Sequence, residues 1–178
     1  MILSSGGLLQ HTGLLRRAAA RKVPVYLPSG ALVGLDGIKA ASMGRLKSVT
    51  LTTRKPPSSF AGAPGVTRRK VRLSDIRTPR VLFQGSASRA VEDFPQNINV
   101  AATLALAGIG AKRTRVRIIA DPAVRNNVHE IEAVGSFGRF AAVTENRPSP
   151  ENPKTSQLAV LSAVATLNQI LQPVKAGT

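Results

Sequence analysis

The sequence predicts an α+β fold in which a mixed sheet carries helices mainly on one face, preceded by a short strand-helix-strand segment. Three observations predict it. The chain opens with an apolar run, a helical stretch and a second apolar run, the order of a βαβ unit. Alternating β-branched runs follow further along the chain. Two of them flank Gly135-Ser136, which indicates an antiparallel hairpin.

Apolar runs, helical spacing and turn residues predict the elements of the first third of the chain. Residues 1–5 and 23–27 are short apolar runs, read as strands, and apolar side chains recur at helical spacing between them. Residues 34–43 predict a short helix that stops at Gly44, and residues 48–53 predict a strand. Residues 56–70 are rich in Pro, Gly, Ser and Arg, which indicates a surface loop.

The remaining elements alternate between sheet and helix. Strands are predicted at 81–84 and 115–120, and Ser86 is placed to cap a helix that runs to Asp93. Residues 97–108 form an Ala/Leu helix that is apolar nearly all round, so we expect it to be buried. The hairpin strands cover 128–134 and 137–144, and a last helix covers 156–171.

Composition narrows the classes of function. The 178 residues contain no cysteine and two histidines, His11 and His129, which excludes disulfides and thiol catalysis and leaves no predicted metal site. The net charge is +16, and residues 1–91 carry +14 of it. Such asymmetry is compatible with a nucleic-acid surface. The sequence contains no membrane-length apolar run and no basic region at its start that would indicate a secretory signal, so we expect a cytoplasmic protein.

His129 is the one candidate acid or base with a sequence context. It lies in Asn127-Val128-His129-Glu130-Ile131, where alternation places its side chain on the same face as Ile131 and Ala133. A half-buried imidazole there could transfer protons near neutral pH, and a structural histidine is the alternative interpretation.

Three further segments carry candidate binding residues. Asn97 and Asn99 begin the buried helix, where they either cap it or recognise a polar ligand. Lys154 and Thr155 precede the last helix, whose N-terminus suits a carboxylate or phosphate, although an ordinary cap is the alternative. Lys55 ends the strand that includes Thr53. The densest basic cluster, Arg68-Arg69-Lys70 with Arg72, has no interleaved aromatic residues for stacking on bases.

Several segments, taken in order, resemble the L-aspartate dehydrogenase family. They span nearly the whole chain and comprise Pro28 to Ala31 with Gly34-Leu35-Asp36, Thr52 to Pro56, Phe94 to Ala101, Thr114 to Pro122, Asn127 to Ile131 and Asn152 to Ser156. The family has an N-terminal Rossmann domain and a C-terminal α+β catalytic and dimerisation domain. The resemblance therefore implies that residues 1–29 are a remnant of the Rossmann domain and that residues 30–178 form the catalytic domain. The glycine-rich phosphate turn of the first βαβ unit is absent from this sequence.

The resemblance also implies an activity and its residues. L-Aspartate would be oxidised with NAD or NADP to iminoaspartate, which is hydrolysed to oxaloacetate and ammonia or used for NAD synthesis. His129 matches the family's catalytic histidine. Ala31 and an amide of the Asn97/Asn99 pair, with Asn99 favoured, match its contacts to the nicotinamide side of the cofactor. Lys55, Lys154 and Thr155 are assigned to the substrate carboxylates from their chemistry alone.

Assembly and activity follow as further expectations. Exposed sheet and apolar helices predict a homodimer, and a separate chain could supply the missing cofactor-binding half. Without that half, we expect weak cofactor binding and weak or no activity, in a truncated or split form of the enzyme. The alternative function is a basic nucleic-acid-binding protein without catalysis, which the absence of a nucleic-acid motif disfavours.

Overall fold

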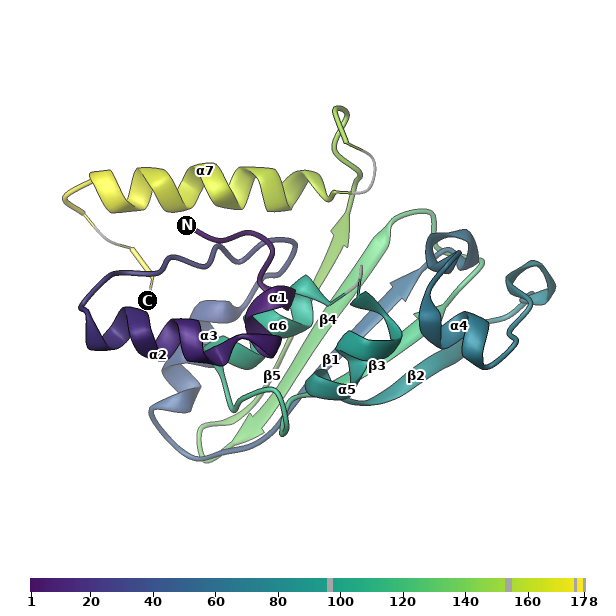
Figure 1. Ribbon diagram of the computed structural model, residues 1–178, viewed down its shortest axis with the longest axis horizontal. Coiled ribbons are helices and arrows are strands. Elements are labelled where there is room, and N and C mark those ends of the chain that lie inside the picture. The colour runs from purple at the N-terminus through teal and green to yellow at the C-terminus, as the bar shows by residue number, and fades with distance from the viewer. Residues whose placement is uncertain (96–97, 153–154, 175, 178) are drawn as a thin grey trace.

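The computed structural model describes residues 1–95, 98–152, 155–174 and 176–177 (Figure 1). Two short helices open the chain and a long one closes it. The helices are α1 (Gly6–Gln10), α2 (Thr12–Ala20), α3 (Leu35–Ser42), α4 (Pro64–Arg68), α5 (Ala87–Asp93), α6 (Asn99–Ala107) and α7 (Gln157–Leu171). The strands are β1 (Leu46–Lys55), β2 (Arg80–Ser86), β3 (Arg115–Ala120), β4 (Asn127–Gly135) and β5 (Gly138–Asn146), and short 3-10 helices cover Pro57–Phe60 and Leu73–Asp75.

The five strands form one mixed sheet in the order β2-β3-β1-β4-β5. β1 and β3 pair in parallel, and the other neighbouring pairs are antiparallel. β4 and β5 form the predicted hairpin, in which Gly135 pairs with Gly138 across the turn. The predicted mixed sheet and α+β class are therefore confirmed.

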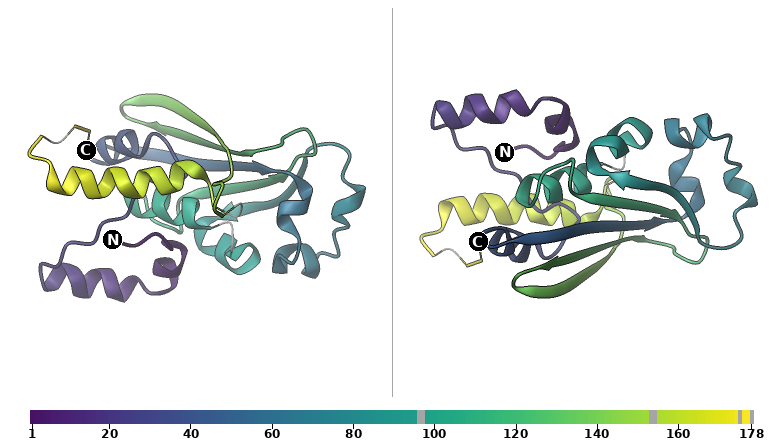
Figure 2. Two further views of the ribbon diagram at one scale, coloured as in Figure 1. Left: turned by 90° about the horizontal axis from the view of Figure 1, so that it is seen from above. Right: turned by 90° about the horizontal axis from the view of Figure 1, so that it is seen from below.

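The helices gather on one face of this sheet. Figure 2 shows the sheet nearly edge-on, with α1, α2, α5, α6 and α7 on the same side and the opposite face uncovered. Alternation explains the choice of face: Val49, Leu51 and Thr53 of β1 are buried, whereas Thr50 and Thr52 between them are only half-buried. α6 is buried from Ala101 to Ala105, as its all-apolar pattern predicted.

Local signals set most element boundaries. α5 begins where the sequence placed its cap, because the Ser86 hydroxyl accepts a hydrogen bond from the Arg89 backbone N–H. α3 follows Gly34, its N-cap residue, which has a positive φ of 81° and approaches β5 so closely that a Cβ there would lie 3.1 Å from the Ala142 Cβ.

The two strands expected at residues 1–5 and 23–27 are not formed. The helical stretch between them is present as α1 and α2, but the flanking runs join no sheet. The Ile2 N–H donates to the Tyr26 carbonyl at 2.9 Å, so the two runs touch through one backbone hydrogen bond. A strand needs a ladder of such bonds, and in the described residues neither run pairs with a strand of the sheet.

The expected surface loop at 56–70 is partly helical. α4 lies in it, and Arg68 and Arg69 at its end both bind the buried carboxylate of Asp93 on α5, at 2.7 and 2.6 Å. Two of the four cations in the densest basic cluster therefore hold helices together. This arrangement removes part of the sequence argument for a nucleic-acid surface.

α7 forms over nearly the predicted range, but its apolar side chains are not covered. Leu161 is 54% exposed and Val164 is 52% exposed, while Ser162 is the buried residue of the helix. In the described part of the chain, no helix is both long and apolar enough to cross a membrane.

Candidate active site

His129 lies near the start of β4 and beside the end of β1, on the helix-covered face of the sheet. It occupies β4 two residues before the buried Ile131, and it is itself only 4% exposed. Its Nδ1 lies 3.0 Å from the hydroxyl oxygen of Thr53, the residue directly opposite on β1. The predicted inward orientation of His129 is what strand alternation produces here.

Burial keeps this imidazole neutral. Desolvation, reinforced by the positive charge of Lys55, lowers the pKa of His129 from 6.5 to about 3. Burial also lowers the pKa of Lys55 from 10.5 to about 8. The sequence argument expected an imidazole that titrates near neutral pH, whereas the structure holds a neutral one beside a lysine that titrates closer to neutrality.

A cavity of about 300 Å³ lies against His129. Five of the residues selected from the sequence line it. They are Ala31, Lys55, Asn99, His129 and Thr155, and they come from five segments that are far apart in the chain. The other two candidates, Asn97 and Lys154, lie outside the described residues.

The walls of this cavity favour an anion. Among its described lining residues there is one lysine and no aspartate or glutamate. Ser156, Ala159 and Val160 bring the N-terminal end of the fifteen-residue helix α7 to the wall. The partial positive charge of a helix N-terminus adds to that of Lys55.

The backbone carbonyl of Ala31 is fixed by two side chains of β5. Thr144 Oγ1 donates to it at 3.0 Å and Asn146 Nδ2 donates to it at 3.1 Å. Two donors occupy both lone pairs of the carbonyl. A ligand must therefore meet Ala31 through its N–H or its methyl group. Gly30, the preceding residue, donates its N–H to Ser162 of α7 at 3.0 Å.

Asn99 is oriented by the N-terminal segment. Its Oδ1 accepts the Gly6 N–H at 2.9 Å, and its backbone carbonyl accepts the Ser5 hydroxyl at 2.8 Å. Gly6 is needed for this approach, because a Cβ there would lie 2.5 Å from Ile98 Cγ2. With Oδ1 occupied, the Asn99 side chain has its Nδ2 donors left for a ligand.

Sequence reasoning missed three residues that support this site: Thr53, Thr144 and Asn146. Thr53 and Asn146 are both buried polar residues, and Thr144 is partly buried. For Thr53 and Thr144 the available signal was a polar residue at an inward position of a predicted strand, whereas Asn146 lies beyond the predicted strand at 137–144. Register alone determines which residue each one meets, and the register is not visible in one sequence.

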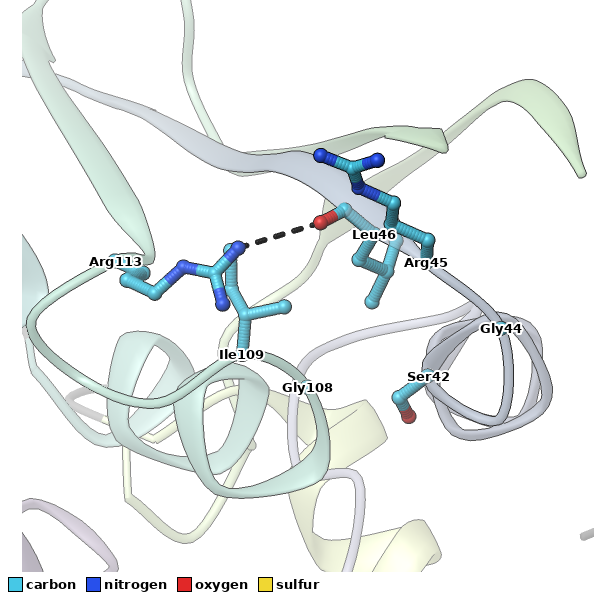
Figure 3. A pocket seen from close by; sticks show the side chains of 7 residues that line it. All are labelled: Ser42, Gly44, Arg45, Leu46, Gly108, Ile109 and Arg113. Carbon is cyan, nitrogen blue, oxygen red and sulfur yellow. Dashed lines mark hydrogen bonds between the residues drawn. The ribbon is translucent and has the colours of Figure 1, made fainter. Parts of the chain in front are cut away.

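A second, larger cavity lies at the other end of β1. It measures about 580 Å³ and is lined by Ser42, Gly44, Arg45, Leu46, Gly108, Ile109 and Arg113. Figure 3 shows Arg113 reaching toward Leu46, whose carbonyl accepts a hydrogen bond from Nη2 at 3.3 Å. None of the selected residues that the structure describes lines it, and its described lining includes no His, Lys, Asp or Glu. The chemistry therefore belongs to the smaller cavity.

The described residues contain no group of three or more His, Asp or Glu side chains placed to hold a metal ion. The chemistry available in the smaller cavity consists of a neutral imidazole, a lysine and amide and hydroxyl groups. These groups can bind an anion and hold an acceptor by hydrogen bonds. They supply no group that could itself accept a hydride, so any redox step needs a bound cofactor.

Comparison with known proteins identifies the class of protein. The family model described as "Aspartate dehydrogenase, C-terminal" matches residues 36–170. The crystal structure of aspartate dehydrogenase from Thermotoga maritima superposes with a TM-score of 0.77 at 29% identity, covering 99% of this chain and 67% of that chain.

Curated relatives named L-aspartate dehydrogenase agree. The one from Methanosarcina mazei is 53% identical over all of this chain, and the one from Bordetella bronchiseptica, L-aspartate dehydrogenase 3, is 42% identical over all of it. The chain spans 67% and 65% of their lengths. The chain belongs to the aspartate dehydrogenase family.

Proposed function

We propose that this chain carries the catalytic site of an NAD(P)-dependent L-aspartate dehydrogenase, which oxidises L-aspartate to iminoaspartate and thereby yields oxaloacetate and ammonia or feeds NAD biosynthesis. One observation carries the proposal. Five residues selected from the sequence converge on one cavity that has no acidic lining residue among those described. Similarity to proteins named L-aspartate dehydrogenase over the full chain supports the same conclusion.

The cavity fits a dicarboxylate. We assign one substrate carboxylate to Lys55 and the other to Thr155 beside the α7 N-terminus. Lys55 is charged below its pKa of about 8, so it offers a charge-assisted hydrogen bond at neutral pH. The helix N-terminus adds a second anion-binding wall.

Asn99 and Ala31 fit the nicotinamide side of a cofactor. The Asn99 Nδ2 donors suit a carboxamide oxygen, and Ala31 offers its N–H and methyl group because its carbonyl is occupied. Bound NAD or NADP would accept a hydride from the substrate α-carbon. His129 acts on the proton of the amine or of the water that attacks the imine. The buried surroundings of His129 exclude bulk water from that exchange.

Assembly belongs to the same proposal. We propose a homodimer, because β5 is an edge strand with Val143 59% exposed and α7 presents uncovered apolar side chains. A cytoplasmic location and a separate cofactor-binding half-chain also stay proposals. Sedimentation at micromolar concentration tests the assembly, and a stable monomer would contradict it.

The activity is tested with a cofactor-binding half supplied. The sequence contains no glycine-rich dinucleotide fingerprint, so the full chain is fused behind the cofactor-binding part of the Methanosarcina mazei relative. We expect L-aspartate-dependent reduction of NAD or NADP, with L-glutamate, one methylene longer, as the control substrate. A folded fusion that binds cofactor and does not turn over L-aspartate would overturn the proposal.

A further inference from the structure

The Thr53 hydroxyl is the hydrogen-bond partner of His129, and Thr53 is not among the described residues that line the cavity. The two residues are Cα partners across β1 and β4, and their side chains share the helix-covered face. Thr53 Oγ1 and His129 Nδ1 are 3.0 Å apart, and the two residues are 2% and 4% exposed. The bond is therefore shielded from water, and Nε2 is the ring nitrogen left for the cavity that His129 lines.

The direction of this bond decides what His129 can do. A neutral imidazole carries one N–H. If the Thr53 hydroxyl donates to Nδ1, the ring proton lies on Nε2 and the cavity meets a donor. If the hydroxyl accepts from Nδ1–H, Nε2 carries a lone pair and the cavity meets a base.

Burial selects between the two directions. Within the described residues, the Thr53 hydroxyl has no hydrogen-bond partner other than His129. When it donates to Nδ1, its O–H is satisfied and only acceptor capacity is unused. When it accepts, its own O–H is buried without an acceptor, and a buried unpaired donor is the costlier defect.

We propose that Thr53 is a positioning residue that holds His129 as the Nε2–H tautomer, so that the ring presents a hydrogen-bond donor to the cavity. Its catalytic meaning rests on the proposed function. Nε2–H donates to the nitrogen of the bound imine, which draws electron density from the C=N bond and favours addition at the carbon. Because Nε2 already carries the ring proton and Nδ1 accepts from Thr53, the ring takes no proton from the amine or from the attacking water. Donation of a hydrogen bond to the imine replaces that proton transfer, and the imidazole stays neutral throughout.

Nitrogen-15 NMR of the full chain tests the tautomer without cofactor or substrate. The chain has two histidines, and a His11→Gln background leaves the signals of His129 alone. We expect the shift of a protonated ring nitrogen at Nε2 and that of an unprotonated nitrogen at Nδ1. The reverse assignment would overturn the proposal.

Variants of Thr53 test the cause. Thr53→Ser keeps the hydroxyl and should keep the Nε2–H pattern, whereas Thr53→Val is nearly isosteric and should shift His129 to a mixture of tautomers. Thr52→Val, the same change on the next residue of β1 but facing the other way, is the matched control and should leave the pattern unchanged. Unchanged shifts in folded Thr53→Val would overturn the role of Thr53. If that variant does not fold, the wild-type and Thr53→Ser shifts decide.

Kinetics of the fusion protein separate this proposal from the proposed function. Thr53→Val should lower kcat at least tenfold with little change in the KM for cofactor, and Thr53→Ser should restore it. An inactive wild-type fusion with the Nε2–H pattern contradicts the enzyme and leaves the positioning role standing. An active fusion with the Nδ1–H pattern contradicts the positioning role alone.

Discussion

Two cavities of different chemistry lie at the two ends of β1. At its start, the larger cavity is lined by two arginines together with glycine, serine and aliphatic residues. At its end, the smaller cavity collects a buried imidazole, a lysine with a lowered pKa and an oriented amide. The parallel strands β1 and β3 both end on this second side, where ligands of α/β sheets commonly bind. Cavity volume is thus a poorer guide to the site here than the groups that each cavity holds.

The largest expected difference between the two ends is catalytic. In the fusion protein, His129→Asn should reduce turnover by roughly 10²–10⁴-fold, because the shorter asparagine side chain places no N–H at the position of Nε2. Cofactor affinity should change little, since His129 faces the substrate. Steady-state kinetics measure both quantities.

Arg113→Met is the matched control from the other cavity. Arg113 is exposed and its hydrogen bond to the Leu46 carbonyl is long, so turnover should stay within about twofold of the wild type and stability within about 0.5 kcal/mol. If His129→Asn lost stability but kept its turnover, His129 would be a structural histidine.

Acid should destabilise the folded chain because of the buried His129 in the smaller cavity. The folded pKa of His129 is about 3, below the unfolded 6.5, so the unfolded state binds its proton first as the pH falls. This contribution to stability is complete above pH 6.5 and is lost progressively toward pH 3. Urea unfolding at several pH values should show a loss of a few kcal/mol across this window.

His129→Gln should flatten that dependence, because glutamine does not titrate. The control is His11→Gln, since His11 is exposed in the turn between α1 and α2. An equal slope in the wild type and in His129→Gln would show that other groups cause the acid sensitivity.

Lys55→Met should separate substrate binding from the state of His129. Losing a charge-assisted hydrogen bond of about 1.5–3 kcal/mol should raise the KM for L-aspartate roughly 10- to 100-fold. Removal of the like charge should also raise the pKa of His129, which an NMR titration detects. Lys47→Met, an exposed lysine near the start of β1, should change neither quantity.

The smallest expected effect concerns the attachment of Asn99. Gly6→Ala places a Cβ 2.5 Å from Ile98 Cγ2 and 2.9 Å from Asn99 Oδ1, so we expect a loss of about 1–3 kcal/mol of stability. Cofactor binding by the fusion should weaken as well. Gly7→Ala, which meets nothing within 4 Å, should be neutral or slightly stabilising. Thermal unfolding of the two variants gives the comparison, and equal melting temperatures would contradict the close approach at Gly6.

The sequence predicted elements where local pattern and tertiary demand agree. The hairpin around Gly135-Ser136 and the buried helix α6 are examples, because alternation and an all-round apolar surface each have one structural solution. The runs at 1–5 and 23–27 failed because a strand also needs a neighbour, and no local pattern supplies that information.

The candidate site shows the same division. His129 was identifiable because its strand alternates clearly and its segment resembles a known family. Thr53 was not, because its importance depends on a register that joins it to a residue 76 positions away. The lowered pKa of His129 was equally invisible, since it arises from burial and from a lysine on another strand.

Residues 7–29, which include α2 and most of α1, form a segment that is attached to the cavity wall at both ends. Gly6 is tied to the Asn99 amide, and Gly30-Ala31 is tied to Ser162, Thr144 and Asn146. Detaching the segment removes the hydrogen bond that orients the Asn99 side chain. A ligand that binds only the oriented form of Asn99 therefore stabilises the attached segment. Ligand binding in the cavity should consequently increase the protease resistance of residues 7–29, although few of these residues line the cavity.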